Sequence, residues 1–142
     1  MEVNHHSCGF VVFYQGENGR EFLLLKYPEG HLDLVKGHTE ESDENELETA
    51  KRELLEETGI AEVDVVPGFM HTINYSYTRG DDLHKKKVDF FLGEVFSKET
   101  VLSHEHTAFE WKTYDQAVVE ITFDNARDVL IAAEAFLVTF QS

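Results

Sequence analysis

The segment of residues 52–60, RELLEETGI, constrains this chain more than any other. Three glutamates, Glu53, Glu56 and Glu57, precede Gly59 in it. On an α-helix, residues three and four positions apart share one face, so these carboxylates crowd into a single patch. Like charges at this spacing destabilise a helix unless positive charge lies among them, and a hard divalent cation prefers oxygen ligands. The segment therefore predicts a helix whose acidic face binds metal.

The charge balance narrows the classes of partner. The 142 residues include 12 Lys and Arg against 28 Asp and Glu, a formal net charge of −16. Such a surface repels nucleic acid and anionic membranes, although the same excess also serves solubility or adaptation to a salty cytoplasm. We therefore expect neither a nucleic-acid nor a membrane partner. Metal and a few placed cations would have to attract a polyanionic substrate.

Length and cysteine content favour one cytoplasmic domain over residues 1–142. The single cysteine, Cys8, excludes an internal disulfide, suits a reducing compartment and, in the apolar run of residues 8–13, favours a buried structural thiol. No apolar stretch approaches the roughly 20 residues of a membrane span, and the N-terminus lacks a signal-peptide pattern. We expect a monomer or a weak homodimer.

Hydrophobic periodicity predicts mostly strands. We expect them at about residues 7–14, 21–27, 62–66, 69–77, 86–96 and 108–111, with a short apolar run at 32–35 and a loop at 79–84. A final helix over about residues 124–140 would bury an apolar face of Ala126, Val129, Leu130, Ala133, Leu137 and Phe140.

The acidic helix has start and stop signals. Asp43 or Ser42 can cap it, and Glu46, three residues after Asp43, would complete a capping box. Gly59 is a natural left-handed stop after Thr58. Strands separated by two or three helices predict an α/β (α+β) fold, a mixed central sheet in an α/β/α sandwich.

The residues around the acidic segment resemble the box of the Nudix hydrolases, Gly-x5-Glu-x7-Arg-Glu-U-x-Glu-Glu-x-Gly-U, where U is a bulky aliphatic residue. From Glu44 through Arg52 to Ile60 every fixed position matches. Gly37 departs from the pattern, because it stands seven residues before Glu44 instead of six. Either the loop is one residue longer, or Asp43 takes part of the role of Glu44.

The resemblance implies a loop-helix-loop that binds divalent metal and hydrolyses a nucleoside diphosphate linked to another group. Pyrophosphate hydrolysis needs neutralised phosphate oxygens and an activated water, which clustered carboxylates and Mg²⁺ supply. We expect Glu53, Glu56 and Glu57 to bind Mg²⁺, with Mn²⁺ as an alternative, and the carbonyl of Gly37 to add a ligand. Glu57 or Glu53 is the candidate base, and Arg52 would orient a neighbouring carboxylate.

A narrower resemblance, to the animal-type and archaeal diadenosine tetraphosphate hydrolases, covers nearly the whole chain. Residues 8–13, 21–25, 36–38, 47–50 and 102–106 (LSHEH) carry it. The last segment lies outside the general box. It implies that Glu105 is a fourth carboxylate beside the metal and that His104 and His106 lie near the phosphates, although a loop histidine is often a plain surface residue.

Other positions of that branch imply substrate contacts. Tyr27, His31 and Lys36 match residues that line the polyphosphate channel. Among the lysines of residues 85–87, Lys86 best fits a phosphate-binding position of that branch. Alternatively, the three lysines are solvated residues that keep a sheet edge from pairing with another chain. Phe90 matches an aromatic residue that stacks on adenine in that branch, and Phe123 could supply the opposite face of the stack. Alternatively, both are core residues.

Residues 32–35 lack the Trp and paired prolines usual in that branch, and the loop after Tyr75 looks longer, so the substrate can differ while the chemistry is kept. We expect Mg²⁺-dependent asymmetrical hydrolysis of diadenosine tetraphosphate to ATP and AMP. The alternatives are the same chemistry on a nucleoside triphosphate, an ADP-sugar or the 5′ end of RNA. A non-catalytic nucleotide-binding module and an acidic interaction domain are weaker readings.

Overall fold

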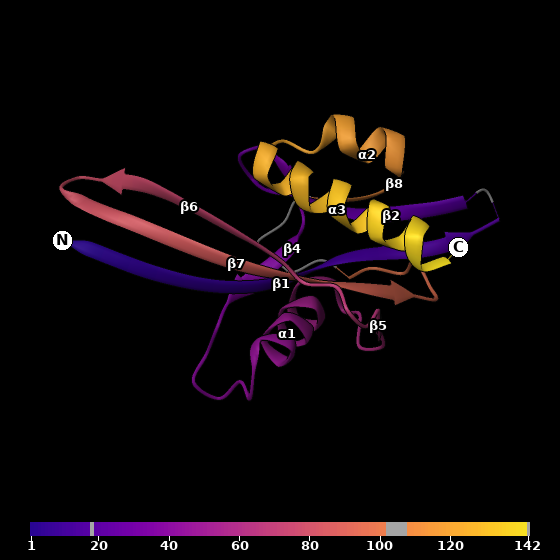
Figure 1. The fold of residues 1–142 in the computed structure, drawn as a ribbon, viewed down its shortest axis with the longest axis horizontal. Coiled ribbons are helices and arrows are strands. Elements are labelled where there is room, and N and C mark those ends of the chain that lie inside the picture. The colour runs from indigo at the N-terminus through magenta and orange to yellow at the C-terminus, as the bar shows by residue number, and fades with distance from the viewer. Residues whose placement is uncertain (18, 102–107, 142) are drawn as a thin grey trace.

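A computed structural model describes residues 1–17, 19–101 and 108–141. These residues form eight strands and three helices (Figure 1). In chain order the elements are β1 (Glu2–Gly16), β2 (Gly19–Lys26), β3 (Leu32–Asp33), β4 (Val35–His38), α1 (Glu46–Thr58), β5 (Asp64–Val65), β6 (His71–Arg79), β7 (Asp82–Val95), β8 (Ala108–Thr113), α2 (Tyr114–Glu120) and α3 (Asp124–Gln141).

The long strand β1 organises the sheet. It runs parallel to β7, from Glu2 opposite Leu83 to Tyr14 opposite Val95. Its other edge pairs antiparallel first with β4 and then with β2. The strand β6 pairs with β7, and β8 with β2. The strands β4 and β2 thus occupy successive parts of one edge of β1, and a cleft lies beside β4.

The sheet has helices on both faces, so the predicted α/β/α arrangement with a mixed sheet is confirmed (Figure 1). One core cluster packs under α2 and α3, and the other under α1. Successive residues of β1 alternate between them, since Val11 and Phe13 join the first cluster and Phe10 and Val12 the second. Burial on both faces explains the unbroken apolar run at residues 8–13.

The helix α1 ends as predicted but begins differently. Gly59 adopts a left-handed conformation with φ of 74°, and its N–H donates to the carbonyl of Leu55. The cap is Asn45, whose side chain accepts from the backbone N–H of Glu48. The prediction of a cap at Asp43 or Ser42, with a capping box through Glu46, is therefore wrong. Asp43 instead accepts hydrogen bonds from Thr49 and Arg52, and Asn45, which lies closer to the helix, caps it.

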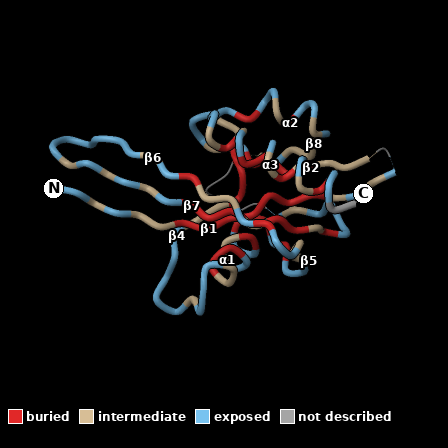
Figure 2. Tube along the Cα trace, viewed as in Figure 1, coloured by how far each residue is buried: buried red, intermediate tan, exposed pale blue. Residues whose placement is uncertain are grey.

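Three strands extend beyond the helices as an arm, formed by the N-terminal part of β1, most of β6 and the start of β7 (Figures 1 and 2). Only Gly80 and Asp81 separate β6 from β7, and Gly80 has φ of 62°. The expected loop over residues 79–84 is thus a tight hairpin, because the register pairs Arg79 directly with Asp82.

The C-terminal region contains a helix that the periodicity did not predict. The helix α2 follows β8 directly. The side chain of Thr113 caps it by accepting from the backbone N–H of Gln116, and the Gln116 side chain accepts from the backbone N–H of Thr113. The helix α3 buries the predicted apolar residues from Ala126 to Leu137, while the side chain of Phe140 is not among those that the structure describes. Among the described residues, no helix is long and apolar enough to cross a membrane.

Candidate active site

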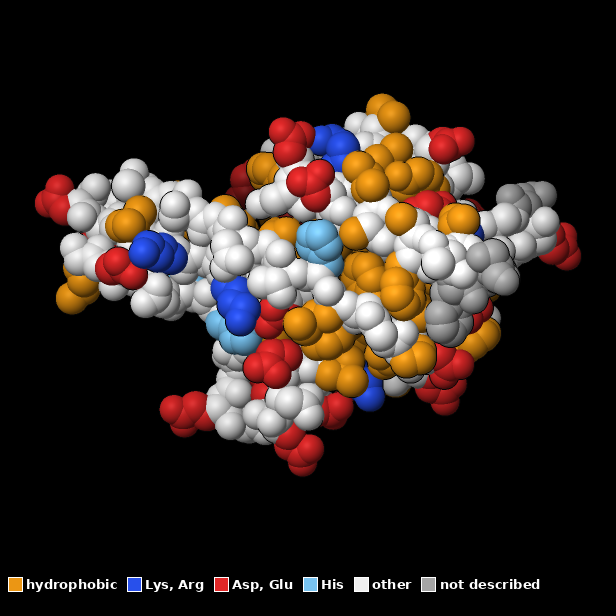
Figure 3. Space-filling model, viewed as in Figure 1, with side chains coloured by type: hydrophobic (Ala, Val, Ile, Leu, Met, Phe, Trp, Pro, Cys, Tyr) orange, Lys and Arg blue, Asp and Glu red, His pale blue; other side chains and the backbone are white. Residues whose placement is uncertain are grey.

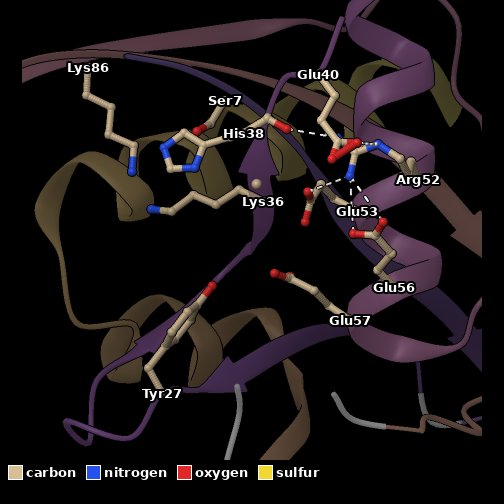
Figure 4. A pocket seen from close by; sticks show the side chains of 11 residues that line it. Ser7, Tyr27, Lys36, His38, Glu40, Arg52, Glu53, Glu56, Glu57 and Lys86 are labelled. Carbon is tan, nitrogen blue, oxygen red and sulfur yellow. Dashed lines mark hydrogen bonds and ion pairs between the residues drawn. The ribbon is translucent and has the colours of Figure 1, made fainter. Parts of the chain in front are cut away.

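A cleft of about 680 Å³ lies between α1 and the edge strand β4. Acidic side chains from α1 and the loop before it form one wall, and basic side chains from the sheet form the other (Figure 4). On the face shown in Figure 3, acidic side chains crowd the end of the molecule that holds α1, while Lys and Arg are scarce. The cleft is lined by Ser7, Tyr27, Lys36, Gly37, His38, Glu40, Arg52, Glu53, Glu56, Glu57 and Lys86.

The helical spacing does bring the three glutamates of α1 into this cleft. Glu57 is only 6% exposed, and its carboxylate points toward the middle of the cleft (Figure 4). Glu53 lies against the backbone of Gly37, where a Cβ atom would come within 2.0 Å of the carboxylate. Gly37 therefore allows a carboxylate and a backbone segment to approach more closely than any other residue would.

Arg52 supplies the positive charge that the acidic patch requires. Its Nη1 donates to Glu53 at 2.9 Å and to Glu56 at 3.1 Å, and its Nη2 donates to the carbonyl of His38 at 2.8 Å. The pKa of Arg52 is raised, chiefly by its hydrogen bond with Asp43 and further by those with Glu56 and Glu53. Arg52 thus contacts two of the predicted metal ligands and ties α1 to the end of β4.

Asp43, and not Glu44, meets Arg52. The carboxylate of Asp43 accepts from Arg52, from the hydroxyl of Thr49 at 2.7 Å and from the backbone N–H of Glu40 at 2.9 Å. The hydrogen bond from Arg52 is the main cause of a pKa well below the usual range for Asp43. Glu44 is exposed. Of the two alternatives that the box spacing left open, the structure therefore gives this position to Asp43.

The opposite wall carries Lys36, His38 and Lys86. Burial lowers the pKa of Lys86, and the nearby charge of Lys36 lowers it further. The pKa of His38 is also lowered, first by burial and then by Lys86. The ammonium of Lys36 is held at 3.0 Å by Asp33, a buried carboxylate that the sequence did not single out. This wall thus presents the ammonium groups of Lys36 and Lys86 beside the imidazole of His38, whose lowered pKa favours the neutral form.

Three aromatic rings continue from the basic wall. Tyr27 and His31 stack with ring centroids 4.6 Å apart, and His31 lies 5.1 Å from Phe123. Phe123 is 44% exposed. It lines a neighbouring cavity of about 460 Å³ that shares Lys36 with the cleft and also includes Tyr75. The structure therefore brings the three predicted channel residues, Tyr27, His31 and Lys36, close to Phe123, the predicted stacking residue.

Phe90 does not join this group, so its assignment as a stacking residue is wrong. Its side chain is fully buried, in the core cluster beneath α2 and α3. It lies opposite Gly9 of β1 and His71 of β6, in the middle of the sheet. A ring in this position has no surface to offer a base.

Alternation along β7 separates the three lysines. Lys86 lines the cleft, while Lys85 and Lys87 project from the opposite face of the strand and are exposed. His104, Glu105 and His106 lie outside the described residues. Ser7 and Glu40, which also line the cleft, have no signal in the sequence pattern because neither belongs to the box.

Comparison with known proteins decides the family, because the chain matches the NUDIX domain over residues 5–133. The chain belongs to the NUDIX family. It is 34% identical to the asymmetrical bis(5′-nucleosyl)-tetraphosphatase of Rattus norvegicus, over 92% of this chain and 94% of that one, and 33% identical to that of Mus musculus over the same shares. A solved binary complex of Caenorhabditis elegans Ap4A hydrolase has a TM-score of 0.83 at 26% identity, over 95% of this chain and 98% of that one.

The resemblance to Nudix hydrolases is therefore confirmed, and the chain is a Nudix pyrophosphohydrolase. The acidic wall of this Nudix hydrolase fits the divalent metals that its family generally uses. Three carboxylates and the backbone of Gly37 form an all-oxygen donor set within one cleft. Hard divalent cations prefer such donors. Because Gly37 has no side chain, the Glu53 carboxylate lies close enough to the backbone for both to contact one metal ion.

Proposed function

We propose that this Nudix hydrolase cleaves diadenosine tetraphosphate asymmetrically, to ATP and AMP, in an Mg²⁺-dependent reaction. One observation carries the proposal: Glu53, Glu56 and Glu57 face Lys36 and Lys86 across a single cleft. A polyphosphate between these walls would meet ammonium groups on one side and metal-binding carboxylates on the other. The names of the Rattus norvegicus and Caenorhabditis elegans relatives support this choice of substrate.

The residues that would hold Mg²⁺, or Mn²⁺ in its place, are Glu53, Glu56, Glu57 and the carbonyl of Gly37. Bound there, the metal would neutralise charge on phosphate oxygens and lower the pKa of a water molecule. Glu105 remains proposed as a fourth carboxylate, with His104 and His106 near the phosphates.

Glu57 is the proposed general base. It is buried, yet its carboxylate is directed into the cleft, so it can accept a proton from a water that attacks phosphorus (Figure 4). Glu53 is the alternative base, but its carboxylate accepts a hydrogen bond from Arg52 and lies against the backbone of Gly37. Arg52 would keep Glu53 and Glu56 oriented without itself touching the substrate.

Lys36 and Lys86 would bind phosphate oxygens, since an ammonium makes strong charge-assisted hydrogen bonds to phosphate. Asp33 fixes the position of the Lys36 ammonium. The rings of Tyr27, His31 and Phe123 lie at the end of this channel, beside the cavity of about 460 Å³. We infer that one adenosine lies there, because a base can stack on an exposed aromatic ring.

A nucleotide panel tests the proposal. Diadenosine tetraphosphate, nucleoside triphosphates, an ADP-sugar and a capped RNA oligonucleotide are incubated with Mg²⁺, and the products are separated by chromatography. We expect preferred cleavage of diadenosine tetraphosphate to ATP and AMP. Equal rates across the panel would contradict the substrate, and two ADP molecules as products would contradict the asymmetric cut.

A matched pair of glutamates on α1 tests the base. Glu57→Gln should lower kcat at least a hundredfold, because it removes both a ligand and a proton acceptor. Glu48→Gln is the control, since Glu48 lies on the same helix but pairs with Lys51 outside the cleft. Wild-type turnover by the Glu57→Gln variant would refute the assignment.

We also infer that the enzyme works in the cytoplasm. The support is its single cysteine, which forms no internal disulfide and suits a reducing compartment. Fractionation of cells that express the chain, with immunodetection, would test the inference.

A further inference from the structure

Three side chains of metal-binding type meet outside the cleft, where β1 and β7 run side by side. Cys8 is the register partner of Asp89, and His6 lies two residues earlier on β1. Side chains two apart on a strand share a face, so all three project from the same side of the sheet. One ligand atom from each lies within 4.8 Å of the others. None of the three lines the catalytic cleft.

We propose that His6, Cys8 and Asp89 form a binding site for a thiophilic divalent cation such as Zn²⁺. The three side chains do not line the oxygen-rich cleft, although Cys8 is the register partner of Gly37 at its edge, and the proposal does not depend on the proposed substrate. An imidazole, a thiolate and a carboxylate together suit Zn²⁺ or Co²⁺ and not Mg²⁺, which prefers oxygen ligands.

The contacts of His6 argue for a metal and against a proton relay. Its Nε2 atom lies 2.7 Å from Oδ2 of Asp89, and the same Nε2 lies 3.9 Å from Sγ of Cys8. A catalytic triad passes a proton through the ring, so it needs the thiol and the carboxylate on different nitrogens. Here a single nitrogen faces both groups. Cys8 has no exposed surface, which also excludes attack on a substrate.

The separations suit a small cation after a limited movement. Zn²⁺ bonds of about 2.0–2.3 Å at tetrahedral angles would place the nitrogen and oxygen about 3.4 Å apart and the nitrogen and sulfur about 3.6 Å apart. The observed sulfur–nitrogen distance, 3.9 Å, is close to this value. The nitrogen–oxygen distance must open from 2.7 Å, and the His6 side chain, 31% exposed, has room to move outward.

The surroundings of Asp89 resemble the outer shell of a metal site. The hydroxyl of Thr72 donates to Oδ1 at 2.6 Å, which leaves Oδ2 directed toward His6. Asp89 is buried, and these two contacts hold its carboxylate with one oxygen facing His6.

The site is open to the surface on one side. Cys8 and Asp89 are buried, whereas the His6 side chain is 31% exposed and leaves a route for a cation to enter.

Titration with Co²⁺ tests the proposal directly. A thiolate bound to Co²⁺ gives a charge-transfer absorption that oxygen ligands do not give, and Cys8 is the only sulfhydryl in the chain. With the acidic cleft saturated by excess Mg²⁺, we expect this band to saturate at one Co²⁺ per chain and to disappear on addition of Zn²⁺. Absence of the band at stoichiometric Co²⁺ would overturn the proposal.

Variants separate the site from non-specific binding. Cys8→Ser should abolish the band, and His6→Gln should weaken Co²⁺ binding at least tenfold, at a partly exposed position that tolerates substitution. Thr72→Val should weaken it about tenfold through the outer shell. His5→Gln is the matched control, because His5 bonds His84 on the opposite face and should leave the titration unchanged. Unaltered affinity in His6→Gln would refute the ligand set.

Discussion

The guanidinium group of Arg52 donates two hydrogen bonds to the carboxylate of Asp43, from Nε at 2.9 Å and from Nη2 at 3.0 Å. The same group bonds Glu53 and Glu56. Asp43, in the loop before α1, therefore fixes the guanidinium group of Arg52, which in turn holds the carboxylates of the acidic wall together. The positions of the proposed metal ligands therefore depend on this loop as well as on the helix.

Asp43→Asn should weaken Mg²⁺ binding and lower activity, whereas Glu44→Gln should change neither. The physical reason is that Asn loses the charge that holds Arg52, while Glu44 is exposed and outside the cleft. We expect the Mg²⁺ concentration for half-maximal activity to rise about tenfold for Asp43→Asn. If Glu44→Gln showed the larger defect, the assignment of this position to Asp43 would be wrong.

The contact between Asp43 and Arg52 also predicts that the stability of the fold depends on pH. The pKa of Asp43 is lowered in the folded state, chiefly by Arg52, from an ordinary value of 3.8. Its contribution to stability is therefore present above about pH 4 and is lost as the pH falls through the lowered pKa. Urea unfolding of the wild type and Asp43→Asn should differ at pH 6 and converge below pH 4. A constant difference across this range would contradict the prediction.

Gly37→Ala should abolish most activity without unfolding the protein. The added methyl group would lie 2.0 Å from the Glu53 carboxylate and displace it from the cleft. We expect a loss of at least a hundredfold in kcat, with an unchanged circular dichroism spectrum. Gly16→Ala is a suitable control, because its nearest contact, at 3.1 Å, is the ring of Tyr14, away from the cleft.

Lys86→Met should stabilise the fold while weakening substrate binding. Burial, together with Lys36, lowers the pKa of Lys86, so its charged form destabilises the folded state below that pKa. We expect a higher Tm at pH 7, a smaller gain at alkaline pH, where wild-type Lys86 is neutral, and a KM about tenfold higher. Lys85→Met, on the exposed opposite face, should leave KM unchanged. A KM for Lys86→Met equal to that of the wild type would remove Lys86 from the substrate site.

Phe123 and Phe90 should respond in opposite ways. Phe123→Ala should raise KM roughly 5- to 150-fold, the range expected for one lost base-stacking contact, with little change in stability. Phe90→Ala should lower the free energy of unfolding by about 3–5 kcal/mol, because it empties a fully buried core position. Urea denaturation and steady-state kinetics distinguish the two effects. A stable Phe90→Ala variant with a raised KM would reverse the assignment.

The local sequence was sufficient to predict the acidic helix and its carboxylate face. Glu53, Glu56 and Glu57 must share a side of any helix, and Gly59 must end it, because both follow from the geometry of a single turn. The alternation of apolar residues likewise placed most strands within a few residues of their observed bounds. These features depend on neighbours in the chain, which the sequence shows directly.

Only the tertiary structure decided between chemically similar neighbours. Residues 42–45 include several that can cap a helix, and the packing of the loop assigned Asn45 to the cap and Asp43 to Arg52. In β7 both faces are apolar near Phe90, so alternation could not show that this ring faces the core. The meeting of His6, Cys8 and Asp89 depends on a parallel register between residues some eighty positions apart, and long-range pairing of this kind leaves no local pattern.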